Sequence, residues 1–244
     1  MKPNRLALIL ASALALAACE SAEQQKAAAT AAAAAQAAAK EQKAQELGKQ
    51  FDAQYAQHNW VLARAHGEEL VVMYPDSPVT ARIRTQYEEA KAKAEATREL
   101  QRMAALWEYQ SIEVKGGHQL SAAIYSKKPV DTGVGTAQPV RLIFRDHPSW
   151  GRSSYLVLEN GDFDCYGGCK VQVTLDDKAP KAMAASRPKT DEAIAMFIED
   201  ERALWRMAGS GAKTMTIEFP VKMGGKRTAV FEVGGLDTGK LPKW

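Results

Sequence analysis

The sequence predicts an α+β protein: an N-terminal helical spacer and short helical bundle, followed by an antiparallel β-sandwich with one packed helix. Three observations lead to this fold class. Residues 20–46 are rich in alanine and lack large apolar side chains, and residues 47–106 repeat apolar side chains with a helical period. Residues 107–244 instead alternate apolar and polar side chains between glycine-containing turns, as half-buried strands do.

Residues 1–18 have the pattern of a secretory signal peptide. Basic side chains precede an apolar run from Leu6 to Ala18, which is shorter than the roughly 20 residues of a permanent transmembrane helix. The motif Leu16-Ala17-Ala18-Cys19 resembles the lipobox of bacterial lipoproteins, in which the cysteine thiol accepts diacylglycerol and the cysteine becomes the new N-terminus. The resemblance implies that Cys19 attaches the protein to membrane lipid. The alternative is an ordinary signal peptide followed by a chance cysteine.

Without residues 1–18 the chain is almost electrically neutral. Removing Lys2 and Arg5 lowers the number of Lys and Arg residues from 32 to 30, against 29 Asp and Glu. This balance gives no indication of nucleic-acid binding, which usually requires a strongly basic surface. Glu20 follows the cysteine. Lipoprotein sorting rules reserve Asp at this position for inner-membrane retention, so the resemblance implies the outer membrane, with the protein facing the periplasm.

Residues 19–46 comprise the cysteine and an alanine-rich spacer. Ala, Glu, Gln and Lys all favour the helix, but no large apolar side chain holds the segment against a core. We therefore expect a solvated, partly helical spacer, with a reach of up to roughly 40 Å if fully helical. The alternative is a coiled coil whose helix–helix interface is formed by alanine side chains, although the segment lacks Leu or Ile at heptad positions.

Residues 47–106 predict a short helical hairpin and a longer third helix. Asn59 is expected to cap a helix from Trp60 to Tyr74, and Ser77 to cap a longer helix that begins at Pro78. The apolar face of that longer helix comprises Val79, Ile83, Tyr87, Ala90, Ala94 and Thr97.

The spacing from Trp60 through Ala63 to Pro75 resembles the second half of a tetratricopeptide unit, within residues 47–78. The resemblance implies a helical hairpin that can offer a peptide groove. One unit is fewer than the three or so repeats that such arrays need for stability, so the resemblance is a loose one.

Seven strands and one helix are expected between residues 107 and 244. The strands cover 108–114, 118–126, 139–145, 153–159, 169–175, 213–221 and 228–233. Glycine pairs between several of them supply the positive-φ positions of tight hairpins. The helix is expected from Thr190 to Ala208, with Thr190 as its cap and Gly209 at its end.

The order of short motifs in residues 107–241 resembles a known family. Trp107 opens a strand, a strand at 139–143 and a cysteine-bearing hairpin follow, and Val230-Phe231-Glu232-Val233-Gly234-Gly235-Leu236 closes the domain. This order is similar to the β-sandwich of the invasion-associated locus B proteins and of small periplasmic accessory proteins of type VI secretion. The resemblance implies a non-enzymatic accessory module of an envelope assembly or secretion system. The family's usual last cysteine is absent, and residues 241–244 stand in its place.

Cys165 and Cys169 flank the turn Tyr166-Gly167-Gly168 and are predicted to form a disulfide. An exported protein meets an oxidising compartment, and the turn can bring the two Cβ atoms to the roughly 3.8 Å that the bond requires. A redox-active pair usually has two intervening residues, and a zinc site needs two further ligands; both are alternatives. Tyr166 is the candidate partner-binding residue, because an aromatic side chain fixed at a rigid tip loses little entropy on binding. The alternative is that Tyr166 folds back onto the sheet and only packs there.

No catalytic group, metal site or cofactor motif is expected. The Asn160–Asp164 segment lacks the later Glu of a calcium loop, and Asp146–Ser149 holds three triad residue types without a nucleophile elbow. The sequence therefore predicts a non-enzymatic outer-membrane lipoprotein that binds a protein partner in the envelope. Two other functions stay open: an envelope-remodelling enzyme with a site in the β-domain, and a purely structural tether.

Overall fold

A computed structural model describes residues 7–189 and 195–244 of the chain, with side chains from Ala22 onward. The α+β class is confirmed, because helices occupy the first part of the chain and an antiparallel sheet the second. The chain divides into two compact units, Met1–Ala96 and Thr97–Trp244, here named the helical unit and the β-unit. Each unit has its own hydrophobic core.

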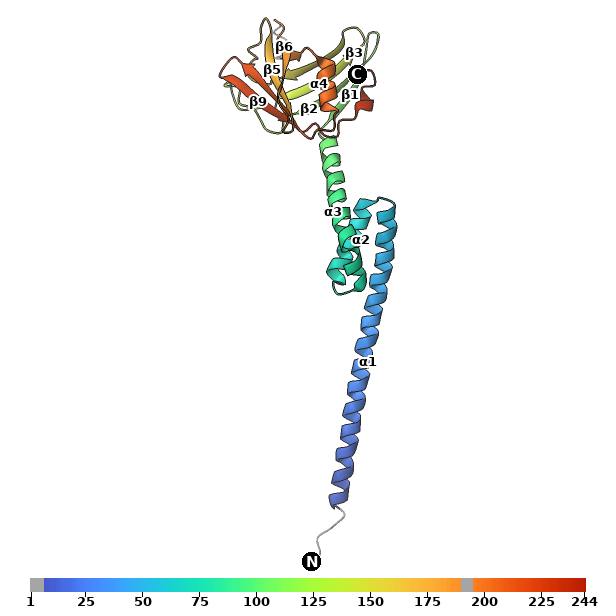
Figure 1. Ribbon diagram of the computed structural model, residues 1–244. Helices are drawn as coiled ribbons and strands as arrows, with labels where there is room; N and C mark the ends of the chain where they lie inside the picture. Colours follow the sequence, from blue (N-terminus) through green and yellow to red (C-terminus); the bar gives the residue numbers. More distant parts are fainter. Residues whose placement is uncertain (1–6, 190–194) are drawn as a thin grey trace, which may run out of the picture. The chain divides into compact units, whose positions relative to one another are not determined.

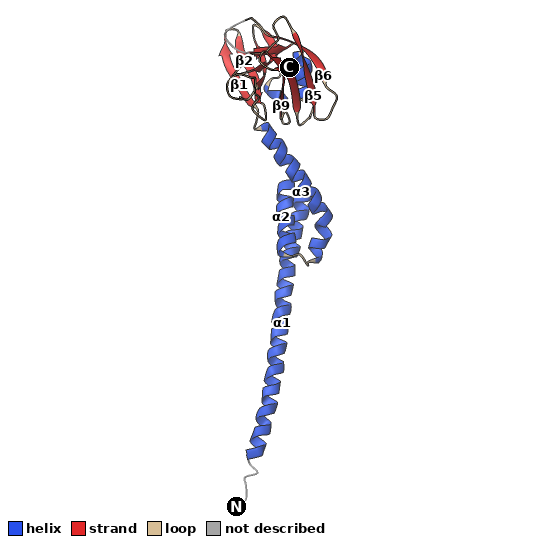
Figure 2. Ribbon diagram, turned by 90° about the vertical axis from the view of Figure 1, so that its left-hand side faces the viewer, coloured by secondary structure: helices blue, strands red, loops and turns tan. Residues whose placement is uncertain are grey.

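The helical unit contains α1 (Ala7–Ala56), α2 (Trp60–Met73) and most of α3 (Pro78–Ala104). Figure 2 shows α2 alongside the C-terminal part of α1. Every residue from Ala22 to Lys40 is exposed, so this part of α1 touches no core. It remains helical because alanine has the highest helix propensity of all residues. The expected exposure of the spacer agrees with the structure, but the segment is helical throughout rather than partly helical and continues without a break into the packed part of α1.

The core of the helical unit forms where the three helices meet. Phe51 of α1, Leu70 of α2 and Ile83 of α3 are completely buried there. Gly67 permits the close approach of the helices, because a Cβ atom at this position would lie 2.4 Å from Tyr87 Cδ2 and 3.1 Å from Phe51 Cε2. Packing of this density leaves no room for a methyl group at residue 67 without a local shift.

The expected starts of the helices at Trp60 and Pro78 are confirmed. Asn59 Oδ1 accepts a hydrogen bond from the Leu62 amide at 3.4 Å, as an N-cap does. Ser77 Oγ likewise accepts from the Val79 amide at 3.2 Å, and α3 begins at Pro78. These signals are local in the sequence, so the sequence alone is enough to locate both helix starts.

After the last turns of α3, the β-unit contains nine described strands, one short helix and one 3-10 turn. The elements are β1 (Glu108–Val114), β2 (Gly117–Tyr125), β3 (Arg141–His147), β4 (Gly151–Val157), β5 (Cys169–Leu175), β6 (Lys181–Ser186), β7 (Ala195–Ile198), α4 (Glu201–Ala208), β8 (Met215–Val221), β9 (Gly225–Phe231) and the 3-10 turn η1 (Thr238–Lys240). The strand order is β1-β2-β3-β4-β7-β6-β5-β8-β9, with every pairing antiparallel.

The sheet folds over on itself around one core. Phe144 and Leu156 from one half, Phe219 and Phe231 from the other, and Leu204 of α4 are all completely buried in the same cluster. A backbone hydrogen bond of 2.7 Å from the Lys127 amide to the Val230 carbonyl also joins the segment after β2 to β9. The expected sandwich is thus a single continuous sheet whose two halves share one core, and α4 lies against that core (Figure 1).

All seven expected strands are present, with ends shifted by a few residues, but the helix expected from Thr190 to Ala208 is wrong over much of its length. Ala195–Ile198 is strand β7, and the helix begins only after Asp200, whose side chain accepts from the Ala203 amide at 3.1 Å. The expected cap Thr190 lies outside the described residues. Strand pairing decides the structure here, because β7 hydrogen-bonds to β4 on one side and β6 on the other.

Strand β6 is also absent from the sequence expectation. Its residues are Lys181-Ala182-Met183-Ala184-Ala185-Ser186, and alanine is depleted in strands. Met183 and Ala185 nevertheless alternate inward with exposed neighbours, and β6 fills the gap between β5 and β7. The inward side chains of Met183 and Ala185 belong to the core of the β-unit.

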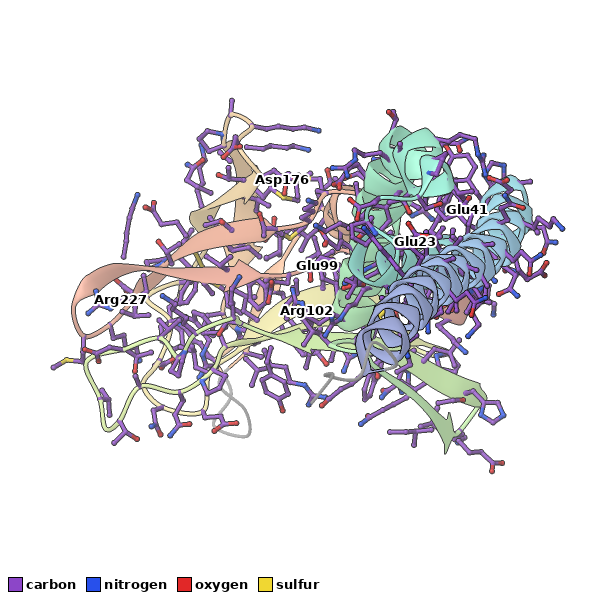
Figure 3. All side chains as sticks on the ribbon, turned by 90° about the horizontal axis from the view of Figure 1, so that it is seen from below. Glu23, Glu41, Glu99, Arg102, Asp176 and Arg227 are labelled. Carbon is purple, nitrogen blue, oxygen red and sulfur yellow. A yellow bond between two sulfur atoms is a disulfide. The ribbon has the colours of Figure 1, made fainter. Side chains whose placement is uncertain are left out.

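The last turns of α3 belong to the β-unit. Met103 is buried there, and Arg102 donates to Glu232, the residue after β9, through Nη2 at 2.6 Å. Figure 3 shows Glu99 and Arg102 side by side, and their ion pair measures 2.7 Å. The hydrogen bond from Arg102 lowers the pKa of the Glu232 carboxyl, and this effect outweighs burial, which raises it.

Candidate functional site

The loop between β4 and β5 carries the Cys165–Cys169 disulfide that the sequence predicts. The two Cα atoms lie 5.1 Å apart, within the usual range for this bond. Gly167 and Gly168 between them have φ values of 80° and 101°, which only glycine adopts readily. The tight turn therefore depends on both the glycines and the covalent bond.

Backbone hydrogen bonds fix this loop on two sides. The Asp164 amide donates to the Pro220 carbonyl at 3.1 Å, and the Lys222 amide donates to the Asp162 carbonyl at 3.0 Å, so one side is tied to the end of β8. On the other side the Arg187 amide, directly after β6, donates to the Cys165 carbonyl at 3.1 Å. The loop is thus an ordered part of the sheet's end.

Asp162 is the centre of the polar contacts under the loop. Its Oδ1 lies 2.8 Å from Arg187 Nε, and its Oδ2 lies 2.7 Å from Lys222 Nζ. The Arg187 side chain is only 2% exposed, so its charge depends on such contacts. Burial alone raises the pKa of the Asp162 carboxyl, but hydrogen bonds from Lys222, Arg187 and Tyr166 prevail and lower it to about 2.

Tyr166 covers these charges. Its hydroxyl donates to Asp162 Oδ2 at 3.0 Å, and the centre of its ring lies 4.4 Å from Lys222 Nζ and 5.3 Å from Arg187 Cζ. Cations at these distances over an aromatic face attract it. Tyr166 is still 38% exposed, so it combines both expectations for this residue: it folds back onto charged neighbours and presents part of its surface to solvent.

The cluster of Asp162, Tyr166, Arg187 and Lys222, here named the Tyr166 surface, holds an aromatic side chain in place. A carboxylate with a pKa of about 2 that binds two cations is a weak proton acceptor at neutral pH. The hydrogen bond to Asp162 also raises the pKa of Lys222, which keeps that ammonium charged. The arrangement therefore suits binding better than proton transfer.

The segment with three triad residue types does not converge on one reacting atom. His147 ends β3 and is buried, and its Nδ1 accepts hydrogen bonds from the amides of Ser149 and Trp150 at 3.1 and 3.3 Å. Both hydrogen bonds stay within the turn that follows β3. Trp150 stacks on the His147 ring at 3.9 Å and is 72% exposed.

Cys19 lies within α1, and its side chain is outside the part of the chain whose side chains are described. No helix of residues 7–189 or 195–244 is long and apolar enough to cross a bilayer. Over the same residues, no three His, Cys, Asp or Glu side chains gather closely enough to hold a metal ion.

The residues that hold Tyr166 are the part of the site that sequence reasoning missed. Asp162 carries a weak signal, because it follows the Asn160-Gly161 turn close to the cysteine pair. Arg187 and Lys222 carry none, since each follows a different strand far along the chain. Only the antiparallel pairing of β5 with β6 and β8 brings them to the same end of the sheet.

Comparison with known proteins found no matching family model, no matching curated protein and no matching solved structure. The resemblances to bacterial lipoproteins, to the tetratricopeptide unit and to the invasion-associated locus B proteins accordingly stay predictions from the residues that carry them.

Proposed function

We propose that this protein is a lipid-anchored, non-enzymatic protein of the outer membrane that faces the periplasm and binds a protein partner through the Tyr166 surface. The proposal has two parts, an anchor with a spacer and a binding surface. Each part rests on its own observations and is tested separately.

The anchor is supported by the sequence around Cys19 and by the helix that follows it. A lipidated cysteine needs a segment that carries the folded part of the protein away from the membrane surface. Residues 22–40 are helical and exposed throughout, and they would span roughly 30 Å at 1.5 Å per residue. A helix with no apolar face has no evident packing role within the helical unit, which fits a spacer.

The observation that carries the binding proposal is the fixed position of Tyr166. A disulfide, three backbone hydrogen bonds and the Asp162 carboxylate hold the loop, while 38% of Tyr166 stays exposed. An aromatic side chain that is already ordered loses little further freedom when a partner covers it. Tyrosine is also enriched among the interface residues that contribute most to binding.

The test is site-specific photo-cross-linking in cells. A photoreactive amino acid at position 166 should give a discrete cross-linked species, and the same amino acid at exposed Ile112 on β1 should not. Replacing both cysteines, Cys165→Ser and Cys169→Ser, should lower the amount of this cross-linked species, because the loop that carries residue 166 is no longer held in place by the disulfide. Identical species from positions 166 and 112, or none from position 166, would contradict the proposal.

A quantitative version compares two substitutions of the same residue. With the cross-linked partner identified, Tyr166→Ala should weaken its affinity at least about tenfold, as expected for a residue contributing about 2 kcal/mol. Tyr166→Phe keeps the ring and removes only the hydroxyl, and should retain most of the affinity. Equal affinity of Tyr166→Ala and the unsubstituted protein would place the partner elsewhere on the molecule.

A further inference from the structure

A second surface of the β-unit is a pocket of about 500 Å³ lined by Arg152, Arg202, Trp205, Arg206, Lys243 and Trp244, here named the terminal pocket. Arg202 and Arg206 lie one helical turn apart on α4, so both side chains project from the same face. Arg152 comes from β4, and the last two residues come from the end of the chain. Three separate segments therefore converge on one cavity.

The wall of the terminal pocket is a group of packed aromatic rings. Trp244 lies 5.1 Å from Trp205 and 5.5 Å from Phe144, measured between ring centres, and Phe144 lies 5.0 Å from Trp205. Arg152 donates to the Lys243 carbonyl, which joins the end of the chain to β4. These contacts order the pocket before any ligand arrives.

Within residues 22–189 and 195–244, the four cations of the terminal pocket form no ion pair with a carboxylate. These cations are Arg152, Arg202, Arg206 and Lys243. Arg206 Nε donates instead to the backbone carbonyl of Arg202 at 3.3 Å, which leaves its charge without a counter-ion among the described residues. Like charges around one cavity repel each other, and a bound anion relieves that repulsion.

The indole N–H of Trp244 supplies a further unmet donor. It is buried and has no hydrogen-bond acceptor within the described part of the chain. Buried N–H groups almost always have a partner. A ligand oxygen that reaches this N–H from the pocket beside Trp244 would provide one.

We propose that the terminal pocket binds a phosphate ester. Three guanidinium groups and an ammonium exceed what a single carboxylate can neutralise, whereas a phosphate monoester carries up to two negative charges and three strongly accepting oxygens. Guanidinium groups match phosphate oxygens by paired hydrogen bonds, which makes arginine the preferred residue for such sites. The half-buried indole of Trp244, backed by the buried Trp205, gives the organic part of an ester an apolar surface, which inorganic phosphate would leave unused.

The binding experiment uses the full-length, detergent-solubilised protein and isothermal titration calorimetry. Glycerol 3-phosphate is the soluble probe, and dihexanoyl phosphatidylglycerol presents a phosphodiester of the kind found in a lipid headgroup. Tighter binding of the first probe identifies a free phosphate ester as the source, and tighter binding of the second identifies a lipid. Absence of binding by both probes overturns the proposal.

The variant Arg202→Gln with Arg206→Gln should lower the affinity of the better probe by at least about tenfold, because each lost charged hydrogen bond removes a contact to phosphate. Both side chains are exposed, and thermal unfolding checks that the variant keeps its fold. The matched control is Arg84→Gln with Arg98→Gln, two arginines on α3 outside the pocket whose loss lowers the net charge equally. The control should bind as the unsubstituted protein does. An equal loss in both variants would show only a response to net charge and overturn the proposal.

Discussion

Asp162 is the single residue on which the order of the Tyr166 surface most depends. It accepts hydrogen bonds from Arg187, Lys222 and Tyr166, which come from three different parts of the chain. Loss of its charge would leave the buried Arg187 guanidinium facing a neutral group. Removing a charge that a buried guanidinium contacts is costly, so this position connects the stability of the β-unit to the position of Tyr166.

We predict that Asp162→Asn lowers the free energy of unfolding of the β-unit by about 2 kcal/mol, because it removes one partner of a largely buried ion pair. Urea unfolding of the purified protein measures the change. The matched control is Asp164→Asn, which removes an exposed carboxylate two residues away that makes none of the ion pairs of the described residues. Equal stability of the two variants would show that the Asp162 contacts contribute little.

The effect of Asp162→Asn on stability should also depend on pH. The pKa of Asp162 is lowered to about 2 in the folded protein, below the value of about 3.9 in an unfolded chain. Its contribution is therefore fully present above about pH 4 and is lost as the pH falls toward about 2. The stability difference between the unsubstituted protein and Asp162→Asn should shrink over that range. A difference that is constant with pH would contradict the lowered pKa.

At this scale the sequence is informative about covalent and local features. Two cysteines around a Tyr-Gly-Gly turn are enough to predict the disulfide, and the position of Tyr166 in that turn is enough to make it a candidate binding residue. The sequence does not predict the contacts of Tyr166, because Arg187 and Lys222 reach it only through strand pairing. From the sequence alone, a charged residue in a loop is expected to be solvent-exposed, because its neighbours in the folded protein are not known.

At the scale of elements, the segment from β7 to α4 shows a case in which strand pairing, and not the local sequence, decides the secondary structure. Ala195-Met196-Phe197-Ile198 fits a buried helix face as well as a buried strand, since a short apolar run has no decisive period. The sheet supplies partners on both sides of β7, and the helix is left with eight residues. The helical unit has no such conflict, because its caps and apolar periods agree with its packing.

We predict that Asp200→Ala destabilises the β-unit by about 1 kcal/mol, because it removes the side-chain acceptor of the first turn of α4. The neighbouring substitution Glu199→Ala is the control, since Glu199 is exposed and bonds in this region through its backbone amide. Thermal unfolding compares the two. A larger loss in Glu199→Ala than in Asp200→Ala would contradict the assignment of Asp200 as the cap.

Gly67 provides a second test at this scale. An alanine in a helix is ordinarily favoured over glycine by about 1 kcal/mol. Here the added methyl would lie 2.4 Å from Tyr87 Cδ2, so we predict a net loss of about 1–2 kcal/mol in the helical unit. Ala65→Leu, on the exposed face of α2, should be nearly neutral. Circular dichroism at 222 nm monitors the unfolding of both variants, and a stabilised Gly67→Ala would show that the helices separate easily.

At the scale of the whole molecule, the amino-acid pattern predicts the order of the helical and β parts along the chain. It does not predict the central strands that make the sheet continuous. Alanine-rich, helical-period and alternating segments succeed one another along the chain and become spacer, bundle and sheet. The sequence does not predict the central strands β6 and β7, because they combine short length with alanine and helix-compatible residues. A strand that is stabilised mainly by its two neighbouring strands need not show a recognisable strand pattern in its own sequence.

The spacer gives a prediction at this scale. Deleting residues 22–39 shortens the exposed helix by about five turns, or about 27 Å, and keeps the helical phase of the residues after the deletion. Thermal stability should not change, because these residues are exposed throughout. Cross-linking from position 166 in cells should fall, because the β-unit no longer reaches as far. A helical Glu-Ala-Ala-Ala-Lys segment of the original length should restore it, and unchanged cross-linking in the deletion would exclude a role in reach.

The central claim is that Cys19 carries lipid, and labelled palmitate tests it most directly. If Cys19 is acylated as proposed, cells that express the unsubstituted protein should incorporate label into it. Cys19→Ser should incorporate none and should accumulate as unprocessed or slowly secreted precursor, while Cys165→Ser with Cys169→Ser should label normally. Label that still enters the Cys19→Ser protein, or is absent from the unsubstituted one, would contradict the lipid anchor.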